Sequence, residues 1–215
     1  MAKGLLLDIG GVVLRAGSHL VENLADRDPR LRGVLETFGG IGSDRDELWH
    51  RMLRREVSER EYWAQRAAEL GAAVGEEWST RTMINQLYEG PSEEWLQDQV
   101  VELMAEVKEA GLPLGALTND LKDFHGEKWM SQQEWLTYFD VVVDASLTGV
   151  MKPDPRAFVA GAEALGLPPE EIVYLDDMPW NVEGGLTAGL QAVQVSYDAP
   201  ELAVAEARSR LGLRP

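Results

Sequence analysis

Four short apolar segments of this chain each lead into polar residues, and helical patterns lie between the segments. They are residues 5–7 followed by Asp8, residues 112–117 followed by Thr118, residues 141–143 followed by Asp144 and then Lys152, and residues 172–175 followed by Asp176 and Asp177. Apolar runs of this length, bounded by turn residues, are typical of parallel strands that are buried on both faces. Ligands of such sheets bind beyond the carboxyl ends of the strands, so we expect these polar groups to meet at one crevice.

The order of these polar residues resembles the motif order of the haloacid dehalogenase-like superfamily, and their spacing resembles its phosphatase-type members with a helical cap. The residues that fall on the four motifs are Asp8 on the first, Thr118 on the second, Lys152 on the third, and Asp176 and Asp177 with Asn181 on the fourth. Residues 146–155 and 175–182 match subgroup patterns closely, and the resemblance spans residues 4–197. The branch that the chain resembles contains the amino-terminal phosphatase domain of soluble epoxide hydrolase and bacterial sugar-phosphate phosphatases.

The resemblance implies an α/β fold, with a Rossmann-like doubly wound parallel sheet of about five strands and an inserted all-helical cap. Residues 16–90 contain only helical patterns, which we interpret as about four helices, one of them opened by a capping box from Ser58 to Glu61. We therefore expect residues 1–15 and 91–215 to form the core and residues 16–90 to form the cap.

Two helices and a last strand are also predicted for the core. A helix begins at Pro91 and Ser92, and Gly111 is its expected stop. The apolar run 192–195 predicts the last strand, and a terminal helix follows around residues 202–211.

The resemblance also implies a Mg2+-dependent phosphatase. Asp8 would be the nucleophile, forming an aspartyl-phosphate that water then hydrolyses. Asp8 would also bind the metal, together with the backbone carbonyl of Gly10, with Asp177, and with Asp176 directly or through water. Carboxylates, a carbonyl and waters are the oxygen ligands that Mg2+ prefers.

Further residues would hold the phosphoryl group by the same resemblance. Thr118 and the backbone of Asn119 would donate hydrogen bonds to it, and Lys152 would balance its charge and orient the nucleophile. We count Thr118 and Lys152 with Asp8 as catalytic residues. Gly11, Asn119 and Asn181 are the expected substrate-binding residues, and the substrate would be a small-molecule phosphate monoester.

Gly10 departs from the pattern of this superfamily. Most of its phosphatases carry a second aspartate two residues after the nucleophile, which protonates the leaving alcohol, and Gly10 carries no proton. Positioned acid–base catalysis contributes about 10^2- to 10^4-fold in rate, so slow turnover is one expectation. A non-catalytic protein that binds phosphate or metal is the main alternative. A dehalogenase-type hydrolase is a third, although such an enzyme needs no metal and Asp176 and Asp177 are retained.

Composition limits the partners. The net charge of −17, from 20 Lys and Arg against 37 Asp and Glu, argues against nucleic acid and anionic membranes as partners because it repels them. No cysteine occurs, so neither disulfides nor a thiolate site can form. The apolar start is cut by Asp8 too early for a signal peptide. We expect a cytoplasmic monomer or homodimer.

Overall fold

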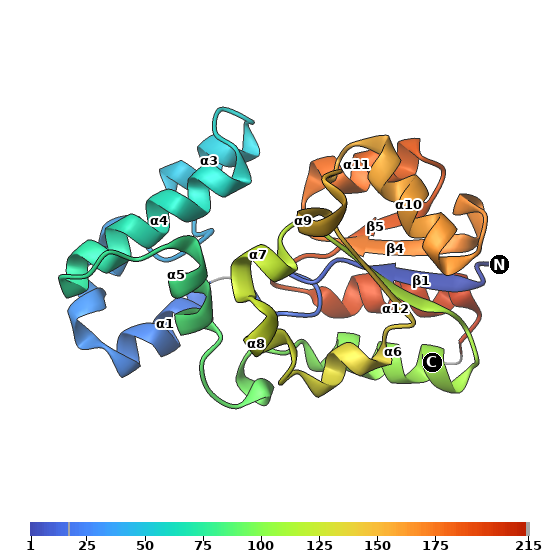
Figure 1. Ribbon diagram of the computed structural model, residues 1–215, viewed down its shortest axis with the longest axis horizontal. Helices are drawn as coiled ribbons and strands as arrows, with labels where there is room; N and C mark the ends of the chain where they lie inside the picture. Colours follow the sequence, from blue (N-terminus) through green and yellow to red (C-terminus); the bar gives the residue numbers. More distant parts are fainter. Residues whose placement is uncertain (17, 214–215) are drawn as a thin grey trace. The chain divides into compact units, whose positions relative to one another are not determined.

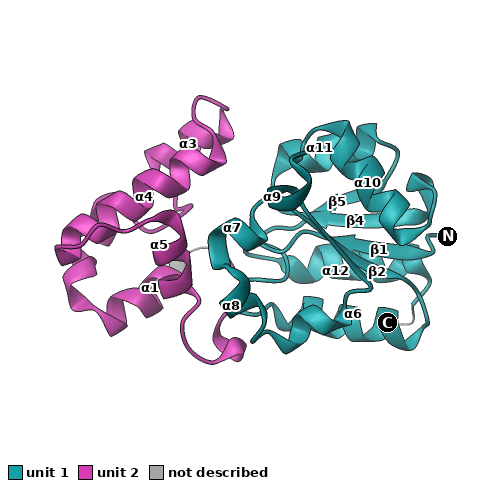
Figure 2. Ribbon diagram, in the orientation of Figure 1, with its two compact units in different colours: residues 1–15, 96–215 teal, residues 16–95 magenta. Residues whose placement is uncertain are grey.

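The structure is a computed structural model, and it describes residues 1–16 and 18–213. The chain forms two compact units, Met1–Arg15 with Leu96–Pro215 and, between them in sequence, Ala16–Trp95 (Figure 2). The sequence predicts a boundary between residues 90 and 91, and the division in the structure falls after Trp95. Residues 91–95 thus group with the helical unit.

The first unit is built on one parallel sheet. Its strands are β1 (Gly4–Leu7), β2 (Leu114–Thr118), β3 (Val141–Asp144), β4 (Ile172–Asp176) and β5 (Gln191–Gln194). They lie side by side in the order β3-β2-β1-β4-β5, and each pair is parallel. The predicted Rossmann-like doubly wound sheet of five strands is confirmed. β1 has the central position because the chain adds β2 and β3 on one side of it and β4 and β5 on the other.

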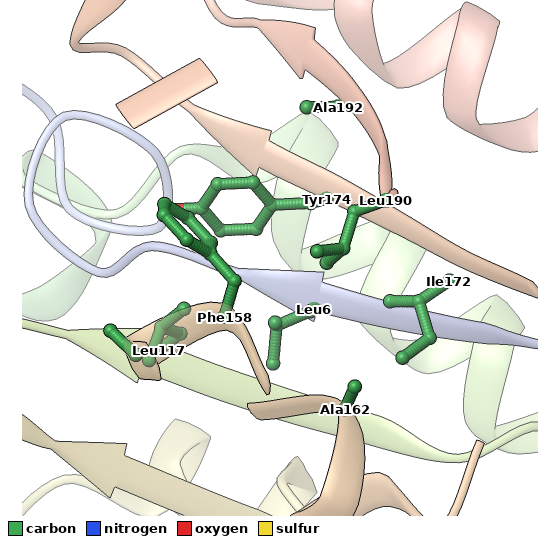
Figure 3. Close-up of a cluster of buried hydrophobic side chains, with 9 residues drawn as sticks. Leu6, Leu117, Phe158, Ala162, Ile172, Tyr174, Leu190 and Ala192 are labelled. Carbon is green, nitrogen blue, oxygen red and sulfur yellow. The ribbon is translucent and has the colours of Figure 1, made fainter. Parts of the chain in front are cut away.

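Helices cover both faces of this sheet (Figure 1). The helices α6 (Asp98–Glu109) and α12 (Pro200–Leu211) contact each other on one face, and α10 (Pro155–Leu165) and α11 (Pro179–Thr187) do so on the other. Figure 3 shows the apolar cluster beneath α10, which includes Leu6, Leu117, Phe158, Ala162, Ile172, Tyr174, Leu190 and Ala192. Each strand places alternate side chains on opposite faces, so cover on both faces explains why every residue of β1, β2 and β4 is buried.

Short helical segments connect the remaining parts of this unit. They are α7 (Leu121–His125), α8 (Glu127–Met130), η3 (Glu134–Tyr138), α9 (Ala145–Thr148) and η4 (Pro169–Glu171). The segments α7 and α9 directly follow β2 and β3, so they begin at the edge of the sheet where strands end.

The secondary structure of the second unit is entirely helical within its described residues, and turns and loops connect the helices. It contains α1 (Ser18–Arg27), η1 (Pro29–Leu31), α2 (Arg32–Phe38), α3 (Glu47–Leu53), α4 (Glu59–Val74), α5 (Thr80–Leu87) and η2 (Ser92–Glu94). The predicted capping box is confirmed, because Ser58 and Glu61 exchange hydrogen bonds at the start of α4. No helix in the described ranges of the chain combines the length and the apolar character that a membrane span needs.

One predicted helix begins later than expected. The sequence predicts a start at Pro91 and Ser92, whereas α6 begins at Asp98. The 3-10 helix η2 occupies Ser92–Glu94, and the chain after it pairs with the segment that leaves β1. Leu96 bridges Leu14, and the amide of Gln97 donates to the carbonyl of Val13 at 2.9 Å. The predicted stop at Gly111 is confirmed, since this glycine follows the end of α6 with a φ of 69°.

Candidate active site

Three buried carboxylates meet where β1 and β4 end. Asp8 directly follows β1, Asp176 is the last residue of β4, and Asp177 comes next. The two strands are neighbours, and the amide of Asp8 donates to the carbonyl of Leu175 at 2.9 Å. After β1 the chain continues to β2 on one side, and after β4 it continues to β5 on the other side. The ends of β1 and β4 therefore flank the topological switch point, where ligands of such sheets bind. Carboxylate oxygens of the three residues lie within 4.8 Å of one another.

Lys152 places a positive charge between two of these carboxylates. Its Nζ lies 2.9 Å from Oδ1 of Asp8 and 2.7 Å from Oδ2 of Asp176, and its side chain is only 1% exposed. Burial alone would lower the pKa of Lys152, but Asp176 and Asp8 raise it above its usual range. Lys152 is therefore a buried cation, and its charge offsets one of the three carboxylates.

Burial raises the pKa of the Asp8 carboxyl above its ordinary range, while Lys152 opposes that rise. The neighbouring charge of Asp176 adds to it. Two negative charges in excess of Lys152 are costly to keep together in a buried place. A divalent cation would remove that cost, so the charge of the cluster favours binding one.

The donor set fits Mg2+. Three carboxylates converge on one point, and the Gly10–Gly11 turn adjoins them. Gly11 has a φ of 74°, and a Cβ on it would lie 2.5 Å from Oδ2 of Asp177, so only glycine allows this approach. Gly10 differs, because a Cβ there would meet nothing within 4 Å. The turn thus needs glycine at position 11 and not at position 10.

Asp176 is held by hydrogen bonds at both oxygens. Oδ1 accepts from the amide of Met178 at 2.8 Å and from the side-chain amide of Asn181 at 3.1 Å. Oδ2 accepts from Lys152 and from the hydroxyl of Tyr174. Direct metal binding by Asp176 would have to replace one of these donors. Asn181 is buried behind Asp176, and its predicted contact with substrate stays a prediction.

The residues at the end of β2 support the loop that carries Lys152. Thr118 is the last residue of β2 and is buried. The side chain of Asn119 accepts a hydrogen bond from the backbone amide of Lys152 at 2.8 Å and donates to its carbonyl at 3.2 Å. Both bonds fix the backbone from which Lys152 reaches the carboxylates. The predicted donation from Thr118 and Asn119 to a phosphoryl group stays a prediction.

Sequence reasoning missed two tyrosines that donate to the acidic cluster. The hydroxyl of Tyr174 donates to Asp176, and the hydroxyl of Tyr197 donates to Asp177. Tyr174 has a signal in the sequence, because residues two apart on a strand share a face and Tyr174 precedes Asp176 by two. Tyr197 has none, because it lies in the turn between β5 and α12.

Comparison with known proteins assigns the family. The chain matches the family model described as haloacid dehalogenase-like hydrolase over residues 2–189. It therefore belongs to the haloacid dehalogenase-like hydrolases, as its motifs predict.

Two named relatives are similar to all or part of the chain. The chain is 28% identical over 213 residues to mouse acyl-CoA dehydrogenase family member 10, covering 98% of this chain and 19% of that protein. It is 35% identical over 92 residues to a phosphatase of Mycobacterium tuberculosis, covering 43% of this chain and 42% of that one. The chain thus spans less than half the length of these two curated relatives.

A solved structure of the same fold is that of the putative haloacid dehalogenase-type hydrolase YfnB from Bacillus subtilis, bound to magnesium. The two are 18% identical with a TM-score of 0.68, and the match covers 99% of each chain. At this identity the likeness concerns the fold.

Proposed function

We propose that this protein is a Mg2+-dependent phosphatase, which hydrolyses a small-molecule phosphate monoester through an aspartyl-phosphate on Asp8. The observation that carries the proposal is the cluster of Asp8, Asp176 and Asp177 around Lys152 at the switch point of the sheet. Membership of the hydrolase family and similarity to a protein named as a phosphatase support it.

The hydrogen bonds of Asp8 suit a nucleophile. Its Oδ1 accepts from the amide of Ile9 at 2.7 Å and lies 2.9 Å from Nζ of Lys152. Both donors act on the same oxygen, so Oδ2 has no hydrogen bond from the described residues. Oδ2 is therefore the oxygen that we propose attacks phosphorus, and the donors on Oδ1 hold the carboxylate in a fixed orientation for that attack.

The remaining residues divide the work around the phosphoryl group. Mg2+, when bound, neutralises phosphoryl charge and fixes the group in line with the nucleophile. Asp8, Asp177 and the carbonyl of Gly10 would hold the ion, and the saturated hydrogen bonds of Asp176 favour its acting through water. Lys152 balances negative charge next to Asp8. Thr118 and the backbone of Asn119 would donate to the phosphoryl oxygens, and Gly11 would leave space for them.

The helical unit is proposed as the cap that selects the substrate. All of its described secondary-structure elements are helices, like the insert expected between the first two motifs. The core unit supplies every residue of the acidic cluster, so the chemistry would be set by the core and the choice of phosphate ester by the helical unit.

The second candidate function is binding of metal and phosphate without turnover, and it is suggested by Gly10. Its lack of a proton donor is the observation that favours this alternative. A dehalogenase is less well supported, because that chemistry has no need for the carboxylates of Asp176 and Asp177 beside the nucleophile.

The test is phosphate release from a panel of phosphate esters, measured with Mg2+ and with a chelator. We expect release to need Mg2+ and to vanish in Asp8→Asn. The matched control is Asp98→Asn, because Asp98 is an exposed aspartate on α6 of the same unit. The control should keep wild-type activity. Full activity in the chelator, or in Asp8→Asn, would overturn the proposal.

A further inference from the structure

The turn after β5 reaches back to the acidic cluster through one tyrosine. Tyr197 lies between β5 and α12 and is half-buried. Its hydroxyl donates a hydrogen bond to Oδ2 of Asp177, although the two residues lie 20 positions apart and on different segments. Hydrogen bonds are directional, so this contact restrains the side chain of Asp177.

The segment that carries Tyr197 is itself fixed to the residues it serves. The side-chain amide of Gln194 donates to the backbone carbonyl of Asp177 at 3.0 Å. The amide of Val195 donates to the carbonyl of Asp176 at 2.9 Å. The backbone leading to Tyr197 is therefore tied to the end of β4 before the hydroxyl reaches Asp177. The hydroxyl is therefore carried by a backbone that is itself fixed in place.

The oxygen that Tyr197 holds is the one that faces the glycine turn. Oδ2 of Asp177 lies 2.5 Å from the place where a Cβ of Gly11 would be. Gly10, whose carbonyl is a proposed metal ligand, is the preceding residue. The tyrosine hydroxyl and the glycine turn thus both border this carboxylate oxygen.

We propose that Tyr197 is a positioning residue for metal binding, which keeps the carboxylate of Asp177 directed at the Gly10–Gly11 turn. This inference rests on the proposed function, because it assumes that the cluster binds Mg2+. It adds a residue outside the four motifs of the site. Mutation of a residue that hydrogen-bonds to a metal ligand typically lowers metal affinity 10- to 100-fold.

The test is Mg2+ binding by calorimetry, without substrate, to the wild-type protein and to Tyr197→Phe. This substitution removes the hydroxyl and keeps the ring. We expect about 10-fold weaker Mg2+ binding. In turnover assays the Mg2+ concentration for half-maximal rate should rise, with kcat at saturating Mg2+ nearly unchanged. The matched control is Tyr138→Phe, a change of the same kind at a partly exposed tyrosine of η3, and it should bind Mg2+ like the wild type.

Thermal melting without Mg2+ separates positioning from a purely structural role. A purely structural role would lower the melting temperature of metal-free Tyr197→Phe and leave its Mg2+ affinity unchanged. Unchanged or tighter Mg2+ binding would overturn the inference, and tighter binding would mean that the hydroxyl competes with the ion. If the wild-type protein binds no Mg2+, the proposed function fails as well, so the two failures differ in the wild-type titration.

Discussion

The Nζ of Lys152 lies 2.9 Å from Oδ1 of Asp8, and both side chains are buried. A charged pair in such a place is costly to break, because the partner that remains is left without compensation. The same ammonium group lies 2.7 Å from Asp176, so it balances two carboxylates that adjacent strands bring together. This one side chain therefore connects the stability of the fold with the chemistry proposed for it.

Replacing Lys152 with methionine should reduce both stability and activity. Lys152→Met keeps most of the length of the side chain and removes the positive charge that lies between Asp8 and Asp176. We expect the free energy of unfolding to fall by about 3–5 kcal/mol at pH 7 without Mg2+, as urea unfolding would measure. Lys128→Met, at an exposed lysine of α8, is the control and should change it by less than about 0.5 kcal/mol. Equal stability of the two variants would contradict the structural role of Lys152.

Mg2+ binding should depend on pH through Asp8. Burial raises the pKa of this carboxyl, so its proton is retained at pH values above the ordinary carboxyl range of about 4. A metal ligand must be ionised, and therefore binding releases that proton. We expect affinity to weaken, by up to about tenfold per pH unit, as the pH falls through the raised pKa.

Calorimetry in buffers of different ionisation enthalpy would measure the proton release directly. The free energy of unfolding of the metal-free protein should depend on pH in the opposite direction to the Mg2+ affinity. A raised carboxyl pKa favours the folded state while the group is protonated, and that contribution is lost as the pH rises through the folded-state pKa. Mg2+ affinity that is constant from pH 5 to pH 8 would exclude a shifted carboxyl among the ligands.

Gly10→Asp should change which phosphate esters are hydrolysed. The leaving group of an aryl phosphate is a weakly basic phenolate. The leaving group of an alkyl or sugar phosphate is a strongly basic alkoxide, which needs a proton. The wild-type protein should therefore show a steep dependence of rate on leaving-group pKa. Gly10→Asp should flatten it, with a gain for alkyl esters of up to about 10^2-fold. The backbone at this position accepts a side chain, since a Cβ on Gly10 meets nothing within 4 Å.

Gly11→Ala is the informative contrast at the neighbouring position. Its Cβ would clash with Asp177, and its φ of 74° is strained for alanine. This variant should bind Mg2+ weakly and melt at a lower temperature.

A flat leaving-group dependence in the wild type would mean that another group supplies the proton, which would remove the reason for the effect of Gly10→Asp.

The sequence predicts the part of the site that depends on strand ends. Asp8 and Asp176 follow apolar runs, and parallel strands bring their ends to one edge of the sheet, so their meeting follows from the pattern. The parallel sheet follows from the same runs, and the doubly wound fold with a helical insert follows from the family resemblance. Burial of β1, β2 and β4 on both faces leaves few other ways to place such segments.

The sequence does not predict what depends on contacts between distant segments. The start of α6 at Asp98 is set by pairing of Leu96 with Leu14, which overrides the local helical pattern near Pro91. Tyr197 is hidden for a similar reason, because its contact with Asp177 is made by a turn that returns to the cluster after β5. The local pattern of apolar and polar residues does not predict either contact.

Trapping the phosphorylated enzyme tests the central claim most directly. The protein would be mixed with a phosphate ester and Mg2+, quenched rapidly in acid, and treated with borohydride, which reduces an aspartyl-phosphate to homoserine. Mass spectrometry of the peptide that contains residue 8 should show homoserine there only when both Mg2+ and ester are present, and never in Asp8→Asn. Mg2+-dependent phosphate release without any modification at Asp8 during turnover would contradict the mechanism.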